Sequence, residues 1–143
     1  MGNLETAQRC ADAMMAKDRS SQALGISIEI PKAGQAIARM LVRDDMVNGF
    51  DVLHGGLTFA LADTAFAFAC NAYDKLTVAA SANIDFLRPA MLGDELTASA
   101  TEDYRGRRSG YYSVEVHNQR GELIALFRGR SASTSDAVVS PTK

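Results

Sequence analysis

The sequence predicts an α+β domain in which an antiparallel sheet of about six strands wraps around one long helix. The first observation is residues 57–72, which are apolar on nearly every side, as expected for a helix that protein surrounds. The second is a set of strand-like segments, two before that helix and four after it, with turn signals between neighbours. Strands joined by short turns are antiparallel, so one sheet can enclose the helix.

The composition fits a single globular domain. The 143 residues are 47% hydrophobic and 22% charged, enough for one domain over residues 1–143 with a core of its own. The formal net charge of −2 gives no reason to expect a nucleic-acid partner. Cys10 and Cys70 are too few and too far apart in sequence for a disulfide framework or a metal cluster. The first residues show no secretion-signal pattern, so we expect free thiols and a cytoplasmic location.

The elements follow one another along the chain in a clear order. An amphipathic helix is expected over residues 3–18, within an N-terminal helical segment of residues 1–20, because apolar side chains recur there at helical spacing. A polar connection, residues 44–53, leads to the long helix. The last residues, 134–143, are small, polar and proline-containing, so we expect a disordered tail. The strands are expected at residues 24–30, 35–42, 76–87, 95–103, 110–117 and 122–133.

The long apolar helix admits a second interpretation, a membrane span. About 20 apolar residues are needed to cross a bilayer. Here the run is shorter, carries Asp63 near its middle and has no basic flank, so we expect a helix buried in protein and no membrane partner. One sheet covers only part of such a helix. We therefore expect a second copy of the chain to cover the rest in a homodimer.

Two features of this helix suggest chemistry. Gly55 and Gly56 at its start leave backbone N–H groups open where the helix dipole favours negative charge. Asp63 lies eight residues after Gly55, too deep to cap the helix, where an unpaired carboxylate is costly to bury. Both features also have a purely structural explanation. A glycine pair permits close packing, and a buried aspartate can fix the dimer register through a serine, threonine or arginine.

The residues around this helix form several motifs that occur together in one known family. They are Asn48-Gly49, His54-Gly55-Gly56, Leu61-Ala62-Asp63-Thr64-Ala65 and Ile84-Asp85-Phe86-Leu87-Arg88-Pro89. The combination resembles the hotdog-fold acyl-CoA thioesterases, and among them the phenylacetic-acid-degradation (PaaI-type) thioesterases. The resemblance covers about residues 24–133.

The resemblance implies a fold, an assembly and a reaction. The fold is the hotdog, in which an antiparallel sheet wraps a long helix, two subunits join edge to edge and dimers pair into homotetramers. The reaction is hydrolysis of an acyl-CoA, preferably an aryl-acetyl one such as phenylacetyl- or hydroxyphenylacetyl-CoA, to the free acid and CoA. No metal or redox cofactor is implied, and the active sites lie at the subunit interface.

Two groups could perform this chemistry. The Gly55 backbone N–H can donate to the developing oxyanion, and Asp63 can either attack the carbonyl carbon or activate water. The sequence leaves both roles of Asp63 open. Eight residues of helix span about 12 Å, so one carbonyl cannot touch both groups of the same helix. The site must combine Gly55 of one subunit with Asp63 of the other, which makes the homodimer a requirement for activity.

Two further residues enter the catalytic site through the resemblance. Asn48 matches the position whose amide orients the attacking water or the carboxylate. His54 matches a position that helps to hold the thioester and the loop. A lone histidine before a glycine pair is also commonly structural, and bonds to local backbone.

Substrate contacts are expected from residues near the helix start and from one basic turn. Arginine pairs well with phosphate oxygens, so the arginines of the turn could bind the CoA phosphates, although a solvated hairpin tip is the plainer explanation for Arg105. Arg88 before Pro89 is a further candidate. Phe59 could line an aryl pocket or simply the core. The predicted substrate-binding residues are Gly56, Phe59, Thr64, Arg107 and Arg108.

Two other functions compete with thioester hydrolysis. One is a non-catalytic acyl-CoA-binding module or sensor of the same fold, in which Asp63 is structural. The other is a hydratase or dehydratase, which ranks last because the sequence lacks the proline-rich histidine segment of the fatty-acid dehydratases. One fold hosts many chemistries, so the site residues carry the preference.

Overall fold

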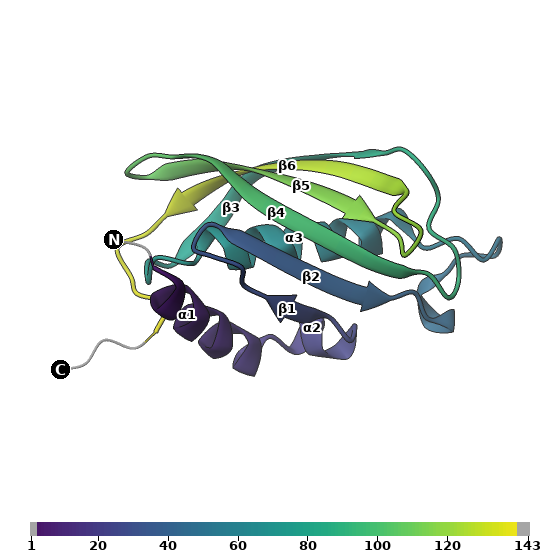
Figure 1. Cartoon of the computed structure of the whole chain (residues 1–143), viewed down its shortest axis with the longest axis horizontal. Helices are drawn as coiled ribbons and strands as arrows, with labels where there is room; N and C mark the ends of the chain where they lie inside the picture. The colour runs from purple at the N-terminus through teal and green to yellow at the C-terminus, as the bar shows by residue number, and fades with distance from the viewer. Residues whose placement is uncertain (1–2, 140–143) are drawn as a thin grey trace.

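Six antiparallel strands form one curved sheet in residues 3–139, the part of the chain that the computed structural model describes (Figure 1). Their order is β1-β2-β4-β5-β6-β3, so β1 and β3 are the edges. The predicted α+β class and six-stranded sheet are therefore confirmed. The strands are β1 (Ser27–Glu29), β2 (Gln35–Leu41), β3 (Thr77–Phe86), β4 (Glu95–Arg105), β5 (Ser109–His117) and β6 (Leu123–Ser133).

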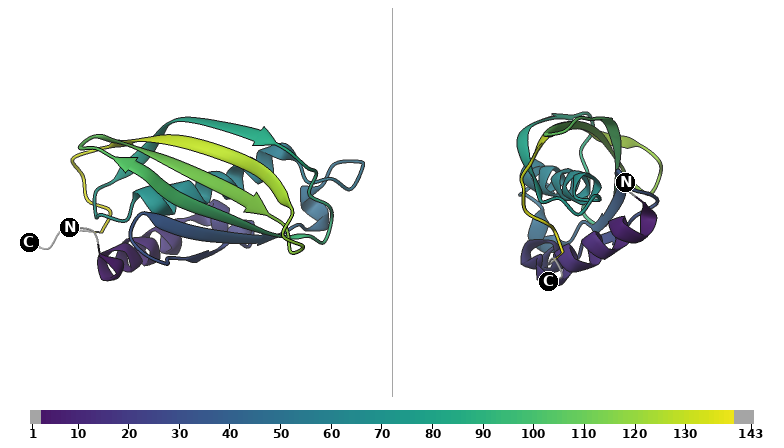
Figure 2. Two further views of the ribbon diagram at one scale, coloured as in Figure 1. Left: turned by 45° about the horizontal axis from the view of Figure 1, so that its top comes forward. Right: turned by 90° about the vertical axis from the view of Figure 1, so that its left-hand side faces the viewer.

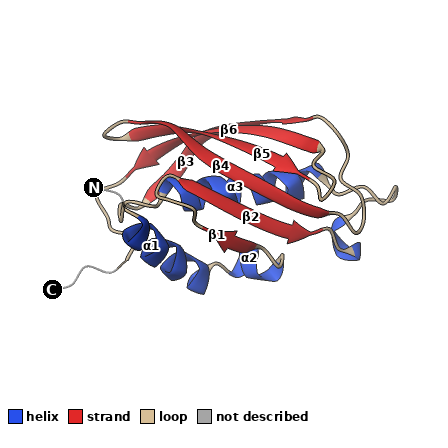
Figure 3. Cartoon of the chain, in the orientation of Figure 1, coloured by secondary structure: helices blue, strands red, loops and turns tan. Residues whose placement is uncertain are grey.

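The long helix lies inside the curve of the sheet. Figure 2 shows it end-on, with the strands bending around it, and Figure 3 shows the two N-terminal helices outside the curve, beside β1. None of the helices in residues 3–139 is long and apolar enough to cross a membrane. The helices are α1 (Leu4–Lys17), α2 (Arg19–Ala23), the short 3-10 helix η1 (Asp44–Met46) and α3 (Gly55–Cys70).

The N-terminal region differs from its prediction in two respects. The helical segment is interrupted at Asp18, whose side chain caps α2 by accepting a hydrogen bond from the Ser21 N–H at 2.9 Å. Gly25 follows with a φ of +71°, a conformation that favours glycine and that turns the chain into the sheet. The first strand is consequently only β1, shorter than the predicted residues 24–30.

The core lies between α3 and the concave face of the sheet. Phe66 is almost fully buried there, with its ring centroid 5.5 Å from that of Tyr112 and 5.7 Å from that of Phe127. At its far end the helix is tied to β3 by Asn71. The Asn71 side chain donates to the Ala67 and Thr77 carbonyls and accepts from the Thr77 N–H, each at 2.9 Å. These contacts fix the helix in position and register against the sheet.

One side of α3 is left partly uncovered by this chain. The members of this exposed stripe recur at three- and four-residue spacing, which places them on one helix face. Edge strand β3 is also exposed over most of its length. The exposed stripe consists of Gly56, Phe59, Ala60, Asp63, Thr64 and Ala67.

The segment after β6 follows a fixed path as far as Val139. Asp74 accepts hydrogen bonds from the backbone N–H groups of Val138 and Val139 at 3.1 and 2.9 Å, and Leu76 pairs with the backbone of Thr134. Residues 134–139 of the expected disordered tail are thus held against the loop that follows α3. Residues 140–143 lie outside the described residues.

Gly129 on β6 tests how tightly the core is packed. A Cβ at this position would lie 2.8 to 2.9 Å from three atoms of the Phe66 ring. We expect Gly129→Ala to lower the free energy of unfolding by about 1–3 kcal/mol, because the ring cannot give way inside a filled core. Chemical denaturation measures this, with Gly49→Ala as the control, since a Cβ at Gly49 would meet nothing within 4 Å. If Gly129→Ala lost no more free energy of unfolding than Gly49→Ala, the Phe66 ring would have room to shift away from the added Cβ.

Candidate active site

A cavity of about 430 Å³ opens at the start of α3. We call it the helix-start cavity. It is lined by Gly55 and Thr58 of the first helical turn, by Phe86 at the end of β3 and by Asn48. The remaining lining residues are Val52, Leu53, Leu87, Arg88, Pro89, Ala90 and Ile124. A hollow that combines apolar side chains with a few polar groups is the usual form of a small-molecule site.

The first backbone N–H groups of α3 are available to a ligand. His54 is the N-cap residue, and its carbonyl accepts from the N–H groups of Leu57 and Thr58. Among the described residues, the N–H groups of Gly55 and Gly56 have no acceptor. Together with the helix dipole, these donors favour an oxygen that carries negative charge.

Gly55 is a position where the chain packs closely against the start of the helix. A Cβ there would lie 3.1 and 3.3 Å from two atoms of the Phe86 ring, closer than ordinary van der Waals contact. The ring of Phe86 therefore lies against the start of the helix and borders the donor of Gly55. A Cβ at Gly56, which is exposed, would meet nothing within 4 Å, so packing in this chain does not require the second glycine.

Asn48 shapes the loop before the helix. Its side-chain oxygen accepts from the N–H groups of Phe50 and Val52 at 2.9 and 3.2 Å, and its backbone N–H donates to the Val52 carbonyl at 2.8 Å. This leaves the side-chain NH₂ group without a partner in residues 3–139, on a residue that lines the helix-start cavity. The amide can thus hold the loop with one end and meet a ligand with the other.

The side chain of His54 does not support the local backbone. It makes no capping hydrogen bond and is exposed, while its backbone N–H donates to the Met46 carbonyl at 3.1 Å. The structural alternative, a histidine that bonds to the backbone around it, therefore has no support in these contacts. His54 is next to Gly55 but does not line the helix-start cavity.

Asp63 lies two turns further along α3, on the exposed stripe. It is half-buried, and among the described residues it has neither an ion-pair partner nor a side-chain hydrogen bond. Partial burial raises the pKa of its carboxyl above the ordinary value, because the charged form loses solvent. The structure of one chain does not bring Asp63 to the helix-start cavity.

Two other side chains that were predicted to contact the substrate already have partners within the chain. The Thr64 hydroxyl donates to the Ala60 carbonyl at 2.7 Å, as threonine commonly does in a helix. The Phe59 ring packs edge-on against Phe127, with centroids 5.4 Å apart, although part of its surface remains on the exposed stripe. Neither residue lines the helix-start cavity.

The predicted arginines lie at the other end of α3. Arg107 and Arg108, in the β4–β5 hairpin, line a second cavity of about 390 Å³ together with Lys75. We call it the hairpin cavity. Lys75 donates to the Arg107 carbonyl at 3.3 Å, and the rest of the lining is Ser133, Thr134 and Ser135. Three cationic side chains among hydroxyl groups suit phosphate oxygens.

The other two arginines have partners of their own. The Arg105 guanidinium lies 3.6 Å from the centroid of the Tyr73 ring, so it stacks on that ring and is not simply a solvated tip. Arg88 lines the helix-start cavity and lies 3.8 Å from a carboxylate oxygen of Glu122.

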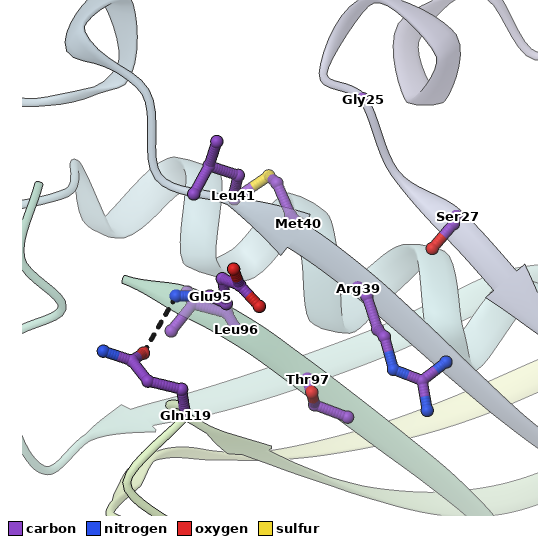
Figure 4. A pocket seen from close by; sticks show the side chains of 9 residues that line it. All are labelled: Gly25, Ser27, Arg39, Met40, Leu41, Glu95, Leu96, Thr97 and Gln119. Carbon is purple, nitrogen blue, oxygen red and sulfur yellow. Dashed lines mark hydrogen bonds between the residues drawn. The ribbon is translucent and has the colours of Figure 1, made fainter. Parts of the chain in front are cut away.

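A further cavity, of about 320 Å³, lies between β2 and β4 near the end of α2 (Figure 4). Two of its polar side chains, Arg39 and Gln119, are engaged within the chain. Arg39 pairs with Glu29 at 2.9 Å, and the side-chain oxygen of Gln119 accepts from the Glu95 N–H at 2.9 Å. The nine lining residues include none of the predicted site residues. We therefore place the candidate active site at the helix start.

Sequence reasoning missed two residues that the structure adds to these cavities. Thr58 lines the helix-start cavity, and its position three residues after Gly55 was the available signal. Lys75 joins Arg107 and Arg108 only through the fold, so the sequence carried no signal for it. No group of three or more His, Cys, Asp or Glu side chains in the described part of the chain is arranged to hold a metal ion.

The chain is similar to known thioesterases in sequence and in structure. Residues 50–125 match the family model described as "Thioesterase superfamily". The acyl-coenzyme A thioesterase PaaI of Escherichia coli is 46% identical over 121 residues, 85% of this chain and 86% of that protein. Human acyl-coenzyme A thioesterase 13 is 33% identical over 98 residues, 66% of this chain and 70% of that protein.

The solved structures agree with the sequence relatives. The structure of the E. coli PaaI protein from the phenylacetic acid degradation operon superimposes with a TM-score of 0.91 at 43% identity, covering 93% of this chain and 96% of that chain. The TT0310 protein of Thermus thermophilus gives 0.78 at 37% identity, over 82% and 99% of the two chains.

Proposed function

We propose that this chain, which belongs to the thioesterase superfamily, hydrolyses aryl-acetyl-CoA thioesters of the phenylacetyl- or hydroxyphenylacetyl-CoA type. Its fold is the hotdog fold of that family, and its enzyme class is acyl-CoA thioesterase. The preference for an aryl-acetyl group is supported by the similarity to E. coli PaaI and by the apolar side chains, Phe86 among them, that line part of the helix-start cavity.

The observation that carries the proposal is the open N–H of Gly55 inside that cavity. A thioester carbonyl whose oxygen accepts from Gly55 gains stabilisation as negative charge develops on that oxygen, and the helix dipole adds to it. Asn48 would donate from its free side-chain NH₂ group to the attacking water or to the carboxylate. His54, exposed beside Gly55, would contact the thioester from outside the cavity.

Asp63 would supply the attacking group in one of two ways. As a general base it takes a proton from water, the resulting hydroxide adds to the carbonyl carbon, and collapse of the intermediate breaks the C–S bond and releases CoA as thiolate. As a nucleophile its carboxylate adds to the carbon, expels the thiolate and leaves an anhydride that water hydrolyses. Both routes need an ionised Asp63 close to the carbonyl.

The reacting Asp63 would come from a second subunit. Along one helix Gly55 and Asp63 are separated by about 12 Å, too far for one carbonyl to meet both. The exposed stripe of α3 and the unpaired edge of β3 support a homodimer, because both lie on the side that this chain leaves uncovered. Dimers would pair into the homotetramer that the family resemblance implies.

The CoA phosphates would bind in the hairpin cavity of the partner subunit. The 16 residues of α3 put this cavity about 24 Å from Gly55 of the same chain. A two-fold axis beside β3 reverses the second helix, which brings the hairpin end of one subunit toward the helix start of the other. One acyl-CoA could then reach from the hairpin cavity to the carbonyl site. Substrate contacts from Gly56, Phe59 and Thr64 on the exposed stripe would lie between the two.

We expect the double variant Arg107→Ala/Arg108→Ala to raise KM for phenylacetyl-CoA about 10-fold and to leave kcat nearly unchanged, because charge-assisted hydrogen bonds to phosphate are lost equally in ground and transition state. Steady-state CoA release measures this, with Arg9→Ala on α1 as the control for loss of an exposed positive charge. A phenylacetyl thioester of N-acetylcysteamine lacks phosphates and should show no difference. An equal KM increase with that substrate would remove the hairpin cavity from CoA binding.

Substrate choice tests the proposed function itself. We would measure thiol release from phenylacetyl-CoA, hydroxyphenylacetyl-CoA and octanoyl-CoA. The proposal expects a higher kcat/KM for the two aryl-acetyl substrates. A preference for octanoyl-CoA would contradict the aryl-acetyl assignment, and tight binding of all three without turnover would identify an acyl-CoA sensor. Cys10 and Cys70 are free and buried, which fits a reducing compartment and supports the cytoplasm as the proposed location.

A further inference from the structure

Thr58 is a buried polar residue at the helix-start cavity, and its hydroxyl has no hydrogen-bond partner in the described part of the chain. Only 3% of its surface is exposed, and it lines the cavity one turn after Gly55. Across residues 3–139 the hydroxyl makes no hydrogen bond, whereas Thr64 in the same helix donates to the carbonyl four residues back at 2.7 Å. The His54 carbonyl lies four residues before Thr58, but the Thr58 hydroxyl does not donate a hydrogen bond to it.

The unpaired hydroxyl is not fully enclosed by protein. In the described part of the chain, every side-chain nitrogen or oxygen that is fully shut off from solvent has a hydrogen-bond partner. The Thr58 hydroxyl has none, so it must remain accessible, and the helix-start cavity is the space that this residue lines. A hydroxyl that is otherwise enclosed and unpaired is positioned for a ligand oxygen or nitrogen.

The helix places the Thr58 side chain over the turn that carries the Gly55 donor. Side chains of an α-helix lean toward its N-terminus and cover the turn three to four residues earlier. For Thr58 that turn is His54 and Gly55, and Gly55 has no side chain to stand between them. Thr58 and Gly55 therefore line the cavity from the same turn of the helix.

We propose that the Thr58 hydroxyl is a second oxyanion donor, which hydrogen-bonds to the same thioester oxygen as the Gly55 N–H. The hydroxyl donates without losing its proton, and its bond strengthens as the carbonyl oxygen becomes negative in the tetrahedral intermediate. This inference rests on the proposed thioesterase function and adds one catalytic residue to it. Two donors to one oxygen also fix the direction in which the carbonyl faces the attacking group.

The test compares Thr58→Val, which keeps the shape and removes the hydroxyl, with Thr58→Ser, which keeps the hydroxyl. Thr101→Val is the matched control, because Thr101 is exposed on β4 and lines none of the described cavities. We expect Thr58→Val to lower kcat for phenylacetyl-CoA on the order of 100-fold with little change in KM, as loss of one oxyanion donor does elsewhere. Thr58→Ser should recover most of that turnover, and Thr101→Val should match the wild type.

Other outcomes overturn the inference. Wild-type turnover in Thr58→Val would remove the hydroxyl from the reaction, and equal losses in the valine and serine variants would assign the effect to packing of the methyl group. A lowered thermal midpoint with unchanged kcat would show a structural hydroxyl. Failure of the proposed function is separate, because it would appear as absence of turnover in the wild-type protein.

Discussion

Replacing Asp63 by asparagine is expected to lower kcat for phenylacetyl-CoA by about 10³-fold or more, because the amide can neither accept the proton of water nor attack the thioester carbon. Asparagine keeps the size of the side chain, so the exposed stripe of α3 retains its shape. Single-turnover and steady-state release of CoA measure the effect. Asp63→Ala should be equally inactive, since both variants lack the carboxylate.

The same substitution is expected to stabilise the fold. Burial raises the pKa of the Asp63 carboxyl, so the folded chain favours the protonated form. This stabilising contribution is fully present below the ordinary aspartate pKa of about 3.9 and is lost as pH rises through the raised pKa of the folded chain. At neutral pH the charged side chain therefore opposes folding, and asparagine removes that cost. A rise in the thermal midpoint together with loss of turnover would identify a residue kept for function.

Two results would contradict this role. Turnover in Asp63→Asn close to that of the wild type would leave the carboxylate without a part in hydrolysis. A large fall in the thermal midpoint would instead favour the alternative in which Asp63 fixes the dimer register.

Gly55→Pro is expected to reduce kcat by a further factor on the order of 10² relative to Gly55→Ala, because proline removes the N–H that donates to the oxyanion. The backbone tolerates proline here. Gly55 is the first helical residue, a position that proline favours, and the preceding His54 has a φ of −58° and a ψ of 133°, which suit a residue before proline.

Gly55→Ala is the matched control for this experiment. Either side chain places a Cβ about as close to the Phe86 ring, so the alanine variant reports the cost of crowding while the N–H is kept. Comparing kcat of the two variants isolates the backbone donor. Equal kcat values would mean that the Gly55 N–H takes no part in the reaction. The glycine would then matter only because it leaves space for the Phe86 ring.

The sequence was most informative where one element had a single possible environment. Residues 57–72 are too short for a membrane span and carry Asp63, which favoured a helix buried in protein, and α3 is that helix. Strand alternation and turn residues located all six strands to within a few residues, apart from the short β1. The break at Asp18 was not foreseen, because the helical periodicity of α1 gave no sign that a side-chain cap would start a second helix.

The site was only partly readable from the sequence. Gly55 and Asn48 meet in one cavity because they flank the same helix start, a local arrangement that spacing reveals. Lys75 is 32 residues before Arg107, and only the pairing of β3 with the rest of the sheet brings the two together. For Thr58 the sequence offered only its position three residues after Gly55, because its other distinction is a hydrogen bond that its hydroxyl does not make.

The shared site can be tested directly by mixing two inactive subunits. A mixed dimer joins one Asp63→Asn chain to one Gly55→Pro chain. One of its two sites combines the intact Gly55 of the first chain with the intact Asp63 of the second. The other site lacks both groups. Random mixing makes half of the dimers mixed, so we predict about a quarter of the wild-type turnover from two parents that are each nearly inactive. A mixture that exchanges subunits yet stays as inactive as its parents would contradict a site built from two chains.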